Sequence, residues 1–181
     1  MKIRRAMLES VPVLMLVTCI SVFTGFILNT TFSLGDIIGI LVMTPALLST
    51  GGNVGTSYGA RITTSLHSGL IEPRFKRVRM IYINFFAIYI TGILVTVLIG
   101  FVGFFISILI GPPTLSLAQY IILAVSAGAI DFIIVLFLSL STAFISFRHG
   151  LDPDNIVAPI VTTLADLIGI CSIYLILNLI I

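Results

Sequence analysis

Residues 80–110 of the sequence read MIYINFFAIYITGILVTVLIGFVGFFISILI and contain no charged side chain. A helix needs about 20 consecutive apolar residues to cross the hydrocarbon core of a bilayer. The rest of the chain is similar in composition. Of its 181 residues, 59% are hydrophobic and 9% are charged, whereas soluble domains carry about 25% charged residues. The sequence therefore predicts an all-α, multi-pass membrane protein.

Working outward from this stretch, a hydropathy window marks five hydrophobic segments, each long enough to span a bilayer. They are residues 8–28, 34–57, 80–110, 117–147 and 155–181. Residues 58–67 can extend the second helix beyond the membrane face. The Gly-Pro-Pro sequence at 111–113 separates the third and fourth segments because it cannot continue a helix. We expect one membrane domain that covers residues 1–181.

The basic residues are distributed unevenly between the loops. They lie at the N-terminus, between the second and third segments, or after the fourth: Lys2, Arg4, Arg5, Arg61, Arg74, Lys76, Arg77, Arg79 and Arg148. By the positive-inside rule these regions face the cytoplasm, so the N-terminus is predicted to be inside and the C-terminus outside. The run RFKRVR at 74–79 is interpreted as a topology anchor at anionic lipid, not as a nucleic-acid site.

Three aspartates fall within the hydrophobic segments. A carboxylate at the bilayer centre costs about 2.5–3.5 kcal/mol, and such residues usually mark ion or substrate paths. Asp166 is near the middle of the fifth segment, and Asp131 is near the middle of the fourth, where a site and a packing role are both open. Asp36 is at the outer start of the second segment, where an anion favours a helix N-terminus, although it can also line an outer mouth.

Asp166 belongs to a stripe of small and polar residues on one face of the fifth segment. The stripe comprises Asn155, Pro159, Thr162, Asp166 and Gly169, whose spacings of four and three place them together on a helix. The flanking positions are Ile, Val, Leu and Ala. The stripe predicts an ion path; the alternative is a helix-packing seam that contains a hydrogen-bonded, protonated acid.

A second small and polar stripe runs along the second segment. It contains Pro45, Ser49, Gly52, Thr56, Gly59 and Thr63, with Asn53 beside it. Proline and paired glycines free backbone carbonyls, which a membrane tolerates only where protein or a water-filled cavity satisfies them. We predict an aqueous cation path between the second and fifth helices. The alternative is a kinked, tightly packed helix pair.

The polar groups of the two stripes are carboxylate, amide, hydroxyl and carbonyl oxygens. Oxygen ligands suit a hard cation such as Mg²⁺, which keeps its waters and is often bound through one or two carboxylates. His67 and His149 lie at the cytoplasmic ends and are weak indications of a metal. The sequence holds no Ser/His/Asp set, phosphate loop or zinc spacing, so we expect neither an enzyme nor an organic cofactor.

Two motifs resemble those of a known family. PALLSTGGNVGTSYGARITTSLH, residues 45–67, resembles the proline–glycine–glycine–asparagine signature of the second membrane helix of MgtE-type magnesium transporters. Its ARITTSLH end is especially similar to the solute carrier family 41 proteins. GLDPDNIVAPIVTTLADLIGI, residues 150–170, resembles the segment that opens their last helix. The order of the motifs makes the whole chain similar to one copy of the family's membrane module.

The resemblance implies Mg²⁺ transport across the cell membrane, through a pore on a dimer axis lined by the second and fifth helices. It places the ion-holding aspartate at Asp166 and a contributing carbonyl at Thr162. The helix-two asparagine is Asn53, with Gly51 and Gly52 beside it. Because this chain carries one module, we expect a parallel, two-fold symmetric homodimer.

The sequence also departs from the family's pattern. Bacterial members carry a large cytosolic sensor region before the first span, whereas only a few residues precede the first hydrophobic segment here. We therefore expect no sensor domain. Eukaryotic members carry two modules in one chain, and this chain carries one. Two other functions stay open: a Na⁺- or H⁺-coupled exchanger of the same fold, and an accessory subunit that needs a homologous partner. Asp152 and Asp154 can bind regulatory cations, but we interpret them as caps of the last helix.

Overall fold

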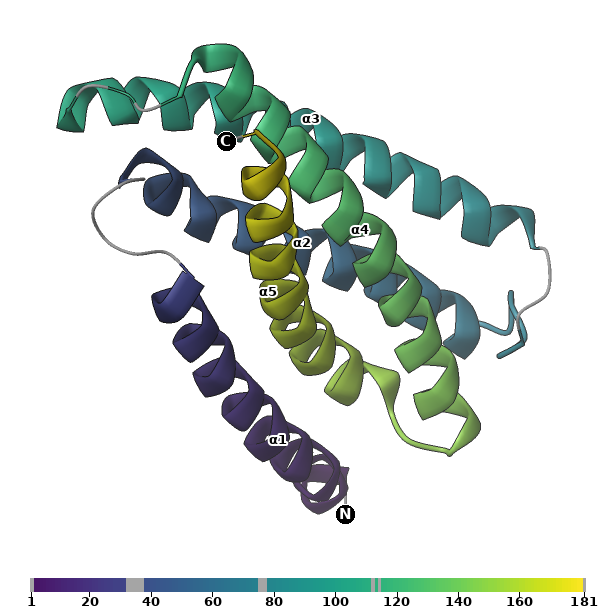
Figure 1. The fold of residues 1–181 in the computed structure, drawn as a ribbon. Coiled ribbons are helices and arrows are strands. Elements are labelled where there is room, and N and C mark those ends of the chain that lie inside the picture. The colour runs from purple at the N-terminus through teal and green to yellow at the C-terminus, as the bar shows by residue number, and fades with distance from the viewer. Residues whose placement is uncertain (1, 32–37, 75–77, 112, 114, 181) are drawn as a thin grey trace.

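A computed structural model describes every residue except 1, 32–37, 75–77, 112, 114 and 181. The described residues form five long helices and no strand (Figure 1). The helices are α1 (Lys2–Thr31), α2 (Ile38–His67), α3 (Arg79–Ile110), α4 (Leu117–Arg148) and α5 (Pro153–Ile180). The predicted all-α class and the five helical segments are confirmed.

Four of these helices are long and apolar enough to cross a membrane: α1 over Met7–Asn29, α3, α4 and α5. The chain is therefore a multi-pass membrane protein. Helix α2 is not among the four, because Gly, Ser, Thr and Asn interrupt its apolar residues. Its 30 residues nevertheless give a length of about 45 Å at 1.5 Å per residue.

The helix boundaries differ from the sequence prediction at several ends. The extension of the second helix to His67 is confirmed. Its predicted start at residue 34 lies outside the described residues. Helices α1 and α5 begin earlier than the hydrophobic segments predicted, at Lys2 and Pro153, because a hydropathy window misses the polar first turns of a helix.

Glycines end two of the helices at the same end of the bundle. Gly69 follows α2 with φ 71°, and Gly150 follows α4 with φ 69°. These left-handed conformations favour glycine and let the next N–H reach back to the helix. Leu70 N–H donates to the Ser65 carbonyl at 3.0 Å, and Leu151 N–H donates to the Ser146 carbonyl at 3.0 Å. The chain therefore turns back sharply after each of the two helices.

Helix α2 occupies the middle of the bundle, where it packs against α3, α4 and α5 (Figure 1). Helices α4 and α5 also pack against each other, and α3 packs on α4. Among the described residues, α5 is the one helix that α1 contacts. Large side chains such as Tyr58, Phe132 and Phe144 fill the space between α2, α3 and α4. The packing brings the two polar stripes onto neighbouring helices.

Candidate functional site

Helices α2 and α5 are in contact at Gly52. A methyl group added there would lie 3.4 Å from Cγ2 and 3.7 Å from Cα of Thr162. These are ordinary van der Waals distances, so α2 and α5 lie directly against each other at this position. The sequence placed Gly52 and Thr162 in the same predicted site, and the structure brings them together.

One face of this helix pair is polar and largely uncovered. Ser49 and Asn53 are exposed on α2, and Thr56 is partly exposed. On α5 Thr162 is exposed and Asp166 is half-buried. We call these five residues the polar face. Polar groups at membrane depth need protein or water around them, so this face requires an aqueous or protein neighbour.

The threonine hydroxyls of the polar face donate to carbonyls of their own helices. Thr56 Oγ1 donates to the Gly52 carbonyl at 2.8 Å, and Thr162 Oγ1 donates to the Ala158 carbonyl at 2.9 Å. Each hydroxyl oxygen keeps its acceptor lone pairs for a cation or its water. Because each hydroxyl proton is donated within its own helix, these hydroxyl groups can act only as hydrogen-bond acceptors on the polar face.

Two prolines flank the polar face, one on each helix. Pro45 is exposed on α2 and Pro159 is partly exposed on α5. A proline within a helix donates no N–H and leaves the carbonyl four residues before it without its helical partner. Both prolines lie where the sequence predicted them, on the same side as Ser49 and Thr162.

Two glycines predicted to line the path lie instead on the packed side of the helices. Gly51 and Gly169 are both buried. A methyl group at Gly51 would collide with Oδ2 of Asp131, and one at Gly169 would lie 2.6 Å from Leu48 Cδ2 and 4.0 Å from the Asp131 carboxyl. Adjacent helix positions such as 51 and 52 point about 100° apart, so only one of the two glycines can face Thr162.

Sequence reasoning assigned Gly51 and Gly59 to the predicted polar path and did not recognise the packing row that they form with Gly55. Its signal was the spacing of four residues, which places small residues on one helix face. A methyl group at Gly55 would collide with Val135 and Val161. The Ser139 hydroxyl donates to the Gly55 carbonyl at 2.8 Å. This row holds α2 against α4 and α5 and so sets the position of the polar face.

Asp131 is enclosed between these helices, with 3% of its surface exposed. Its Oδ1 has no hydrogen-bond partner among the described residues. Asp166 is near enough for the two carboxyl groups to interact electrostatically. An ionised carboxylate enclosed in this way is costly without a counter-charge, and none of the described ion pairs involves Asp131.

We expect Asp131→Asn to preserve the folded state and Asp131→Leu to disturb it. Asparagine has the shape of aspartic acid and fits between Gly51 and Gly169. The free energy of unfolding of the Asp131→Asn variant should therefore differ from that of the wild type by under about 1 kcal/mol. Leucine adds volume against Gly51 and should cost about 1–3 kcal/mol. Thermal unfolding in detergent checks both variants. Equal losses in the two would mean that a charged carboxylate is required.

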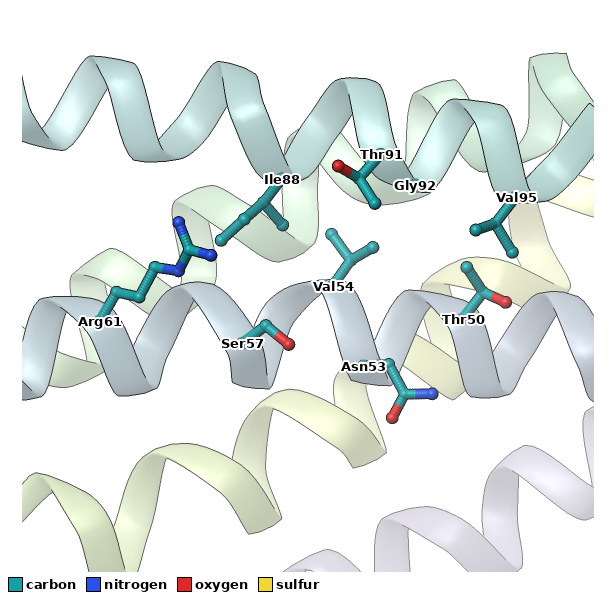
Figure 2. Close-up of a pocket in the computed structure, with 9 residues that line it drawn as sticks. All are labelled: Thr50, Asn53, Val54, Ser57, Arg61, Ile88, Thr91, Gly92 and Val95. Atoms are coloured by element: carbon teal, nitrogen blue, oxygen red, sulfur yellow. The ribbon is translucent and has the colours of Figure 1, made fainter.

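A groove with a volume of about 290 Å³ opens between α2 and α3 beside Asn53. Figure 2 shows Arg61 extending from α2 toward α3, while the Asn53 side chain points away from α3. Arg61 Nη1 donates to Asn84 Oδ1 at 3.0 Å. The amide of Asn53 is thus directed to the side of α2 that carries the polar face.

The remaining predicted residues lie at the other end of α5 or outside the described chain. Asp152 precedes α5, and its Oδ1 accepts a hydrogen bond from Asp154 N–H at 3.1 Å. The predicted capping role of Asp152 is confirmed. Asp154 is in the first turn, where a negative charge stabilises the helix. Asp36 lies outside the described residues.

The fold and the polar face define a class of protein, a multi-pass helical membrane protein whose helices carry exposed side chains with oxygen atoms. A family model described as "MgtE: Divalent cation transporter" matches residues 44–176. The chain belongs to the MgtE family of divalent cation transporters. The resemblance of the two motifs to this family is confirmed.

The chain is also similar to curated solute carrier family 41 proteins. It is 31% identical to solute carrier family 41 member 3 of Mus musculus, over 86% of this chain and 34% of that protein. Identity to member 2 of Homo sapiens is 28%, over 83% of this chain and 28% of that protein. The chain therefore spans about a third of the length of these relatives. No solved structure matches the chain significantly.

Proposed function

We propose that this protein transports a divalent cation, Mg²⁺ foremost, across the membrane along the polar face of α2 and α5. The observation that supports the proposal is the contact of Gly52 with Thr162, which puts the part of α2 that carries Asn53 against the part of α5 that carries Asp166, with Asn53 and Thr162 exposed. A carboxylate at membrane depth in a protein of this family is best explained by the cation that it attracts.

The chemistry of the polar face favours a hydrated hard cation. Its groups are one carboxyl, one amide and several hydroxyls, and it contains no sulfur or imidazole ligand. Mg²⁺ gives up its waters reluctantly, so acceptors that bind those waters suit it. Asp166 would attract the ion, while Asn53 and the threonine oxygens would contact its water shell. Asp131 would act from behind Gly51, through its electrostatic interaction with Asp166.

A second copy of the chain would complete the path. The polar face is exposed in one protomer, and lipid cannot satisfy exposed amide and carboxyl groups. Two parallel copies related by a two-fold axis would bring both faces together around water. Such a homodimer would enclose two Asp166 carboxyl groups around a shared axis.

The test is Mg²⁺ uptake into liposomes that contain only this purified chain, followed with an entrapped fluorescent indicator. We expect uptake driven by an inside-negative potential, with no Na⁺ or H⁺ gradient present. Empty liposomes are the control. Uptake that appears only with a counter-ion gradient would support the exchanger, and the absence of uptake under every condition would contradict self-sufficient transport.

A further inference from the structure

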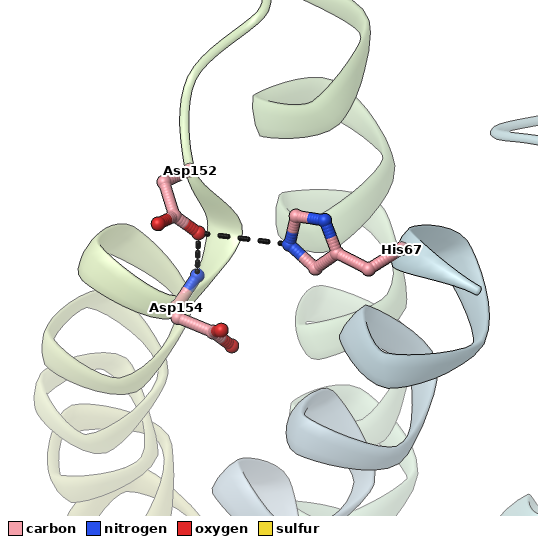
Figure 3. A group of neighbouring side chains, drawn as sticks. All are labelled: His67, Asp152 and Asp154. Atoms are coloured by element: carbon pink, nitrogen blue, oxygen red, sulfur yellow. Dashed lines mark hydrogen bonds and ion pairs between the residues drawn. The ribbon is translucent and has the colours of Figure 1, made fainter.

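Three metal-ligating side chains meet at the end of the bundle where α2 ends and α5 begins. His67 is in the last turn of α2, Asp152 precedes α5, and Asp154 is in its first turn. One ligand atom from each lies within 4.8 Å of the others (Figure 3). The charge distribution predicts that this end faces the cytoplasm. The cluster is far from the polar groups at the middle of α5, since Asp154 and Asp166 are 12 residues apart, about 18 Å along a helix.

The spacing of these atoms fits a shared cation. His67 Nε2 lies 3.7 Å from Asp152 Oδ1. A metal about 2.1 Å from each ligand atom holds those atoms at most about 4.2 Å apart. The separations in the cluster, which are at most 4.8 Å, therefore have to close by roughly 0.6 Å or less to meet this upper limit. Asp154 is exposed, so its side chain can rotate to make this adjustment.

A pocket lined by both polar and apolar residues lies directly beside the cluster. Its volume is about 400 Å³, and Thr56, Thr63 and Asp154 are among the residues that line it. Thr63 is 1% exposed, and its hydroxyl has no hydrogen-bond partner among the described residues. Because Thr63 is four residues before His67 on α2, the two share one helix face. A buried hydroxyl without a partner is costly, and a water bound to a cation in this cavity would satisfy it.

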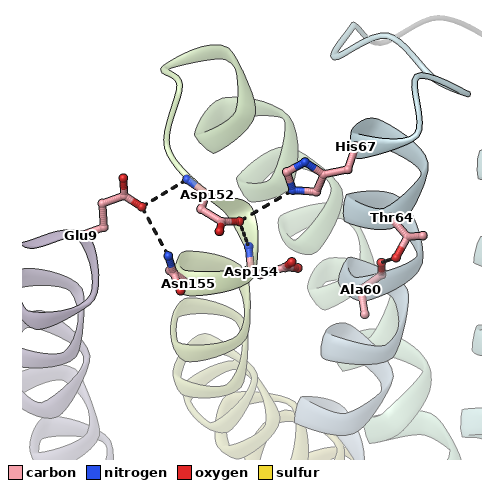
Figure 4. A network of polar contacts seen from close by, with 7 residues as sticks. All are labelled: Glu9, Ala60, Thr64, His67, Asp152, Asp154 and Asn155. Atoms are coloured by element: carbon pink, nitrogen blue, oxygen red, sulfur yellow. Dashed lines mark hydrogen bonds and ion pairs between the residues drawn. The ribbon is translucent and has the colours of Figure 1, made fainter. Parts of the chain in front are cut away.

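Contacts from α1 and α4 hold two of the three ligands in place. Glu9 on α1 accepts hydrogen bonds from Asp152 N–H at 3.3 Å and from the Asn155 side-chain amide at 3.4 Å (Figure 4). The ring of His67 packs edge-on against Phe147 of α4, with centroids 5.5 Å apart. Four helices thus position the cluster, and contacts of this kind around metal ligands strengthen binding.

We propose that His67, Asp152 and Asp154 form a binding site for a divalent transition-metal ion of the Mn²⁺, Co²⁺ or Zn²⁺ type. Imidazole nitrogen binds these metals well, whereas Mg²⁺ prefers oxygen ligands only. The two carboxylates supply the charge, and the α2 C-terminus contributes the negative end of its dipole. An ion at this site joins the end of α2 to the start of α5, and its ligand set differs in kind from that of the polar face.

The test uses the chain's small number of histidines. The sequence has two, His67 and His149, so a purified chain with a histidine-free tag offers only these two imidazoles. Mn²⁺ is titrated at pH of about 7.5, where imidazole is mostly neutral. Electron paramagnetic resonance measures the free ion, and electron spin echo modulation detects nitrogen bound to Mn²⁺. His67→Gln keeps the size of the side chain, and His149→Gln is the matched control.

We expect nitrogen coupling in the wild type and in His149→Gln, and its loss in His67→Gln. Both His67→Gln and Asp154→Asn should weaken Mn²⁺ binding at least about tenfold, which is about 1.4 kcal/mol. Asp166→Asn removes the carboxylate of the proposed transport path and should leave the nitrogen coupling present, which separates the two sites. Circular dichroism confirms that each variant is folded. Nitrogen coupling that is absent from the wild type, or that persists in His67→Gln, would overturn the proposal, as would Mn²⁺ binding that depends on Asp166 alone.

Discussion

Replacing Asp166 with alanine should reduce Mg²⁺ uptake by one to two orders of magnitude. Asp166 is the carboxyl group of the polar face, and it is half-buried on α5 near the contact of Thr162 with Gly52. A hydrogen bond from a metal-bound water to a carboxylate contributes about 1.5–3 kcal/mol. Because 1.4 kcal/mol is tenfold, losing one such bond costs roughly ten- to hundredfold in rate. Uptake into liposomes measures the effect.

Conservative variants separate charge from shape at this position. Asp166→Asn keeps the shape and the hydrogen bonding but removes the charge, so its uptake should be nearly as low as that of the alanine variant. Asp166→Glu keeps the charge and should retain more uptake than either. The matched control is Cys171→Ala, an exposed position on the same helix, which should behave as wild type.

The outcome also decides where the ion site lies. Equal uptake by wild type and Asp166→Ala would move the site away from the polar face, and Asp131 would be the next carboxyl group to test. In that case Asp131→Asn, which we expect to fold normally, would lose uptake. A loss confined to the Asp166 variants supports a single carboxyl position on each protomer.

Local rules predicted much of this structure from sequence. Hydropathy located the helices, and the DPDN sequence predicted the cap that Asp152 forms on α5. The spacing of Thr162 and Asp166 placed them correctly on one face. These features depend on residues that are close in sequence, for which helix geometry is known in advance.

Contacts between distant residues could not be predicted in the same way. Helical spacing did not show that Gly51 lies against Asp131 while its neighbour Gly52 lies against Thr162. That division depends on the rotation of α2 about its axis, which the packing of three neighbouring helices fixes. The approach of His67 to Asp152 likewise depends on how α2 and α5 end, and the sequence offered only a lone histidine.

The second large effect is expected at Gly55, where alanine should destabilise the protein. Alanine in place of an exposed helical glycine usually stabilises by about 0.5–1 kcal/mol. At Gly55, however, the added methyl group would collide with Val135 of α4 and Val161 of α5, and overpacking costs about 1–3 kcal/mol. Thermal unfolding in detergent, followed by circular dichroism, measures the change.

Gly25→Ala is the matched control for Gly55→Ala. Gly25 is also helical, and a methyl group there would meet nothing within 4 Å. The two substitutions make the same chemical change, so we expect opposite signs: a small gain for Gly25→Ala and a loss for Gly55→Ala. A gain at both positions would show that α2 is not held closely against α4 and α5.

Shortening the two valines should reverse the effect of Gly55→Ala. Val135→Ala together with Val161→Ala removes the methyl groups that the new side chain would meet, so on that background Gly55→Ala should cost less than in the wild type. The difference is a coupling energy, expected at about 0.5–3 kcal/mol for residues in contact. Because Gly55 and the polar face belong to the same helix, displacement of α2 should also lower Mg²⁺ uptake, and the valine variants should restore part of it. A coupling energy near zero would mean that α2 tolerates the methyl group by another route, and that the glycine row does not set the position of the polar face.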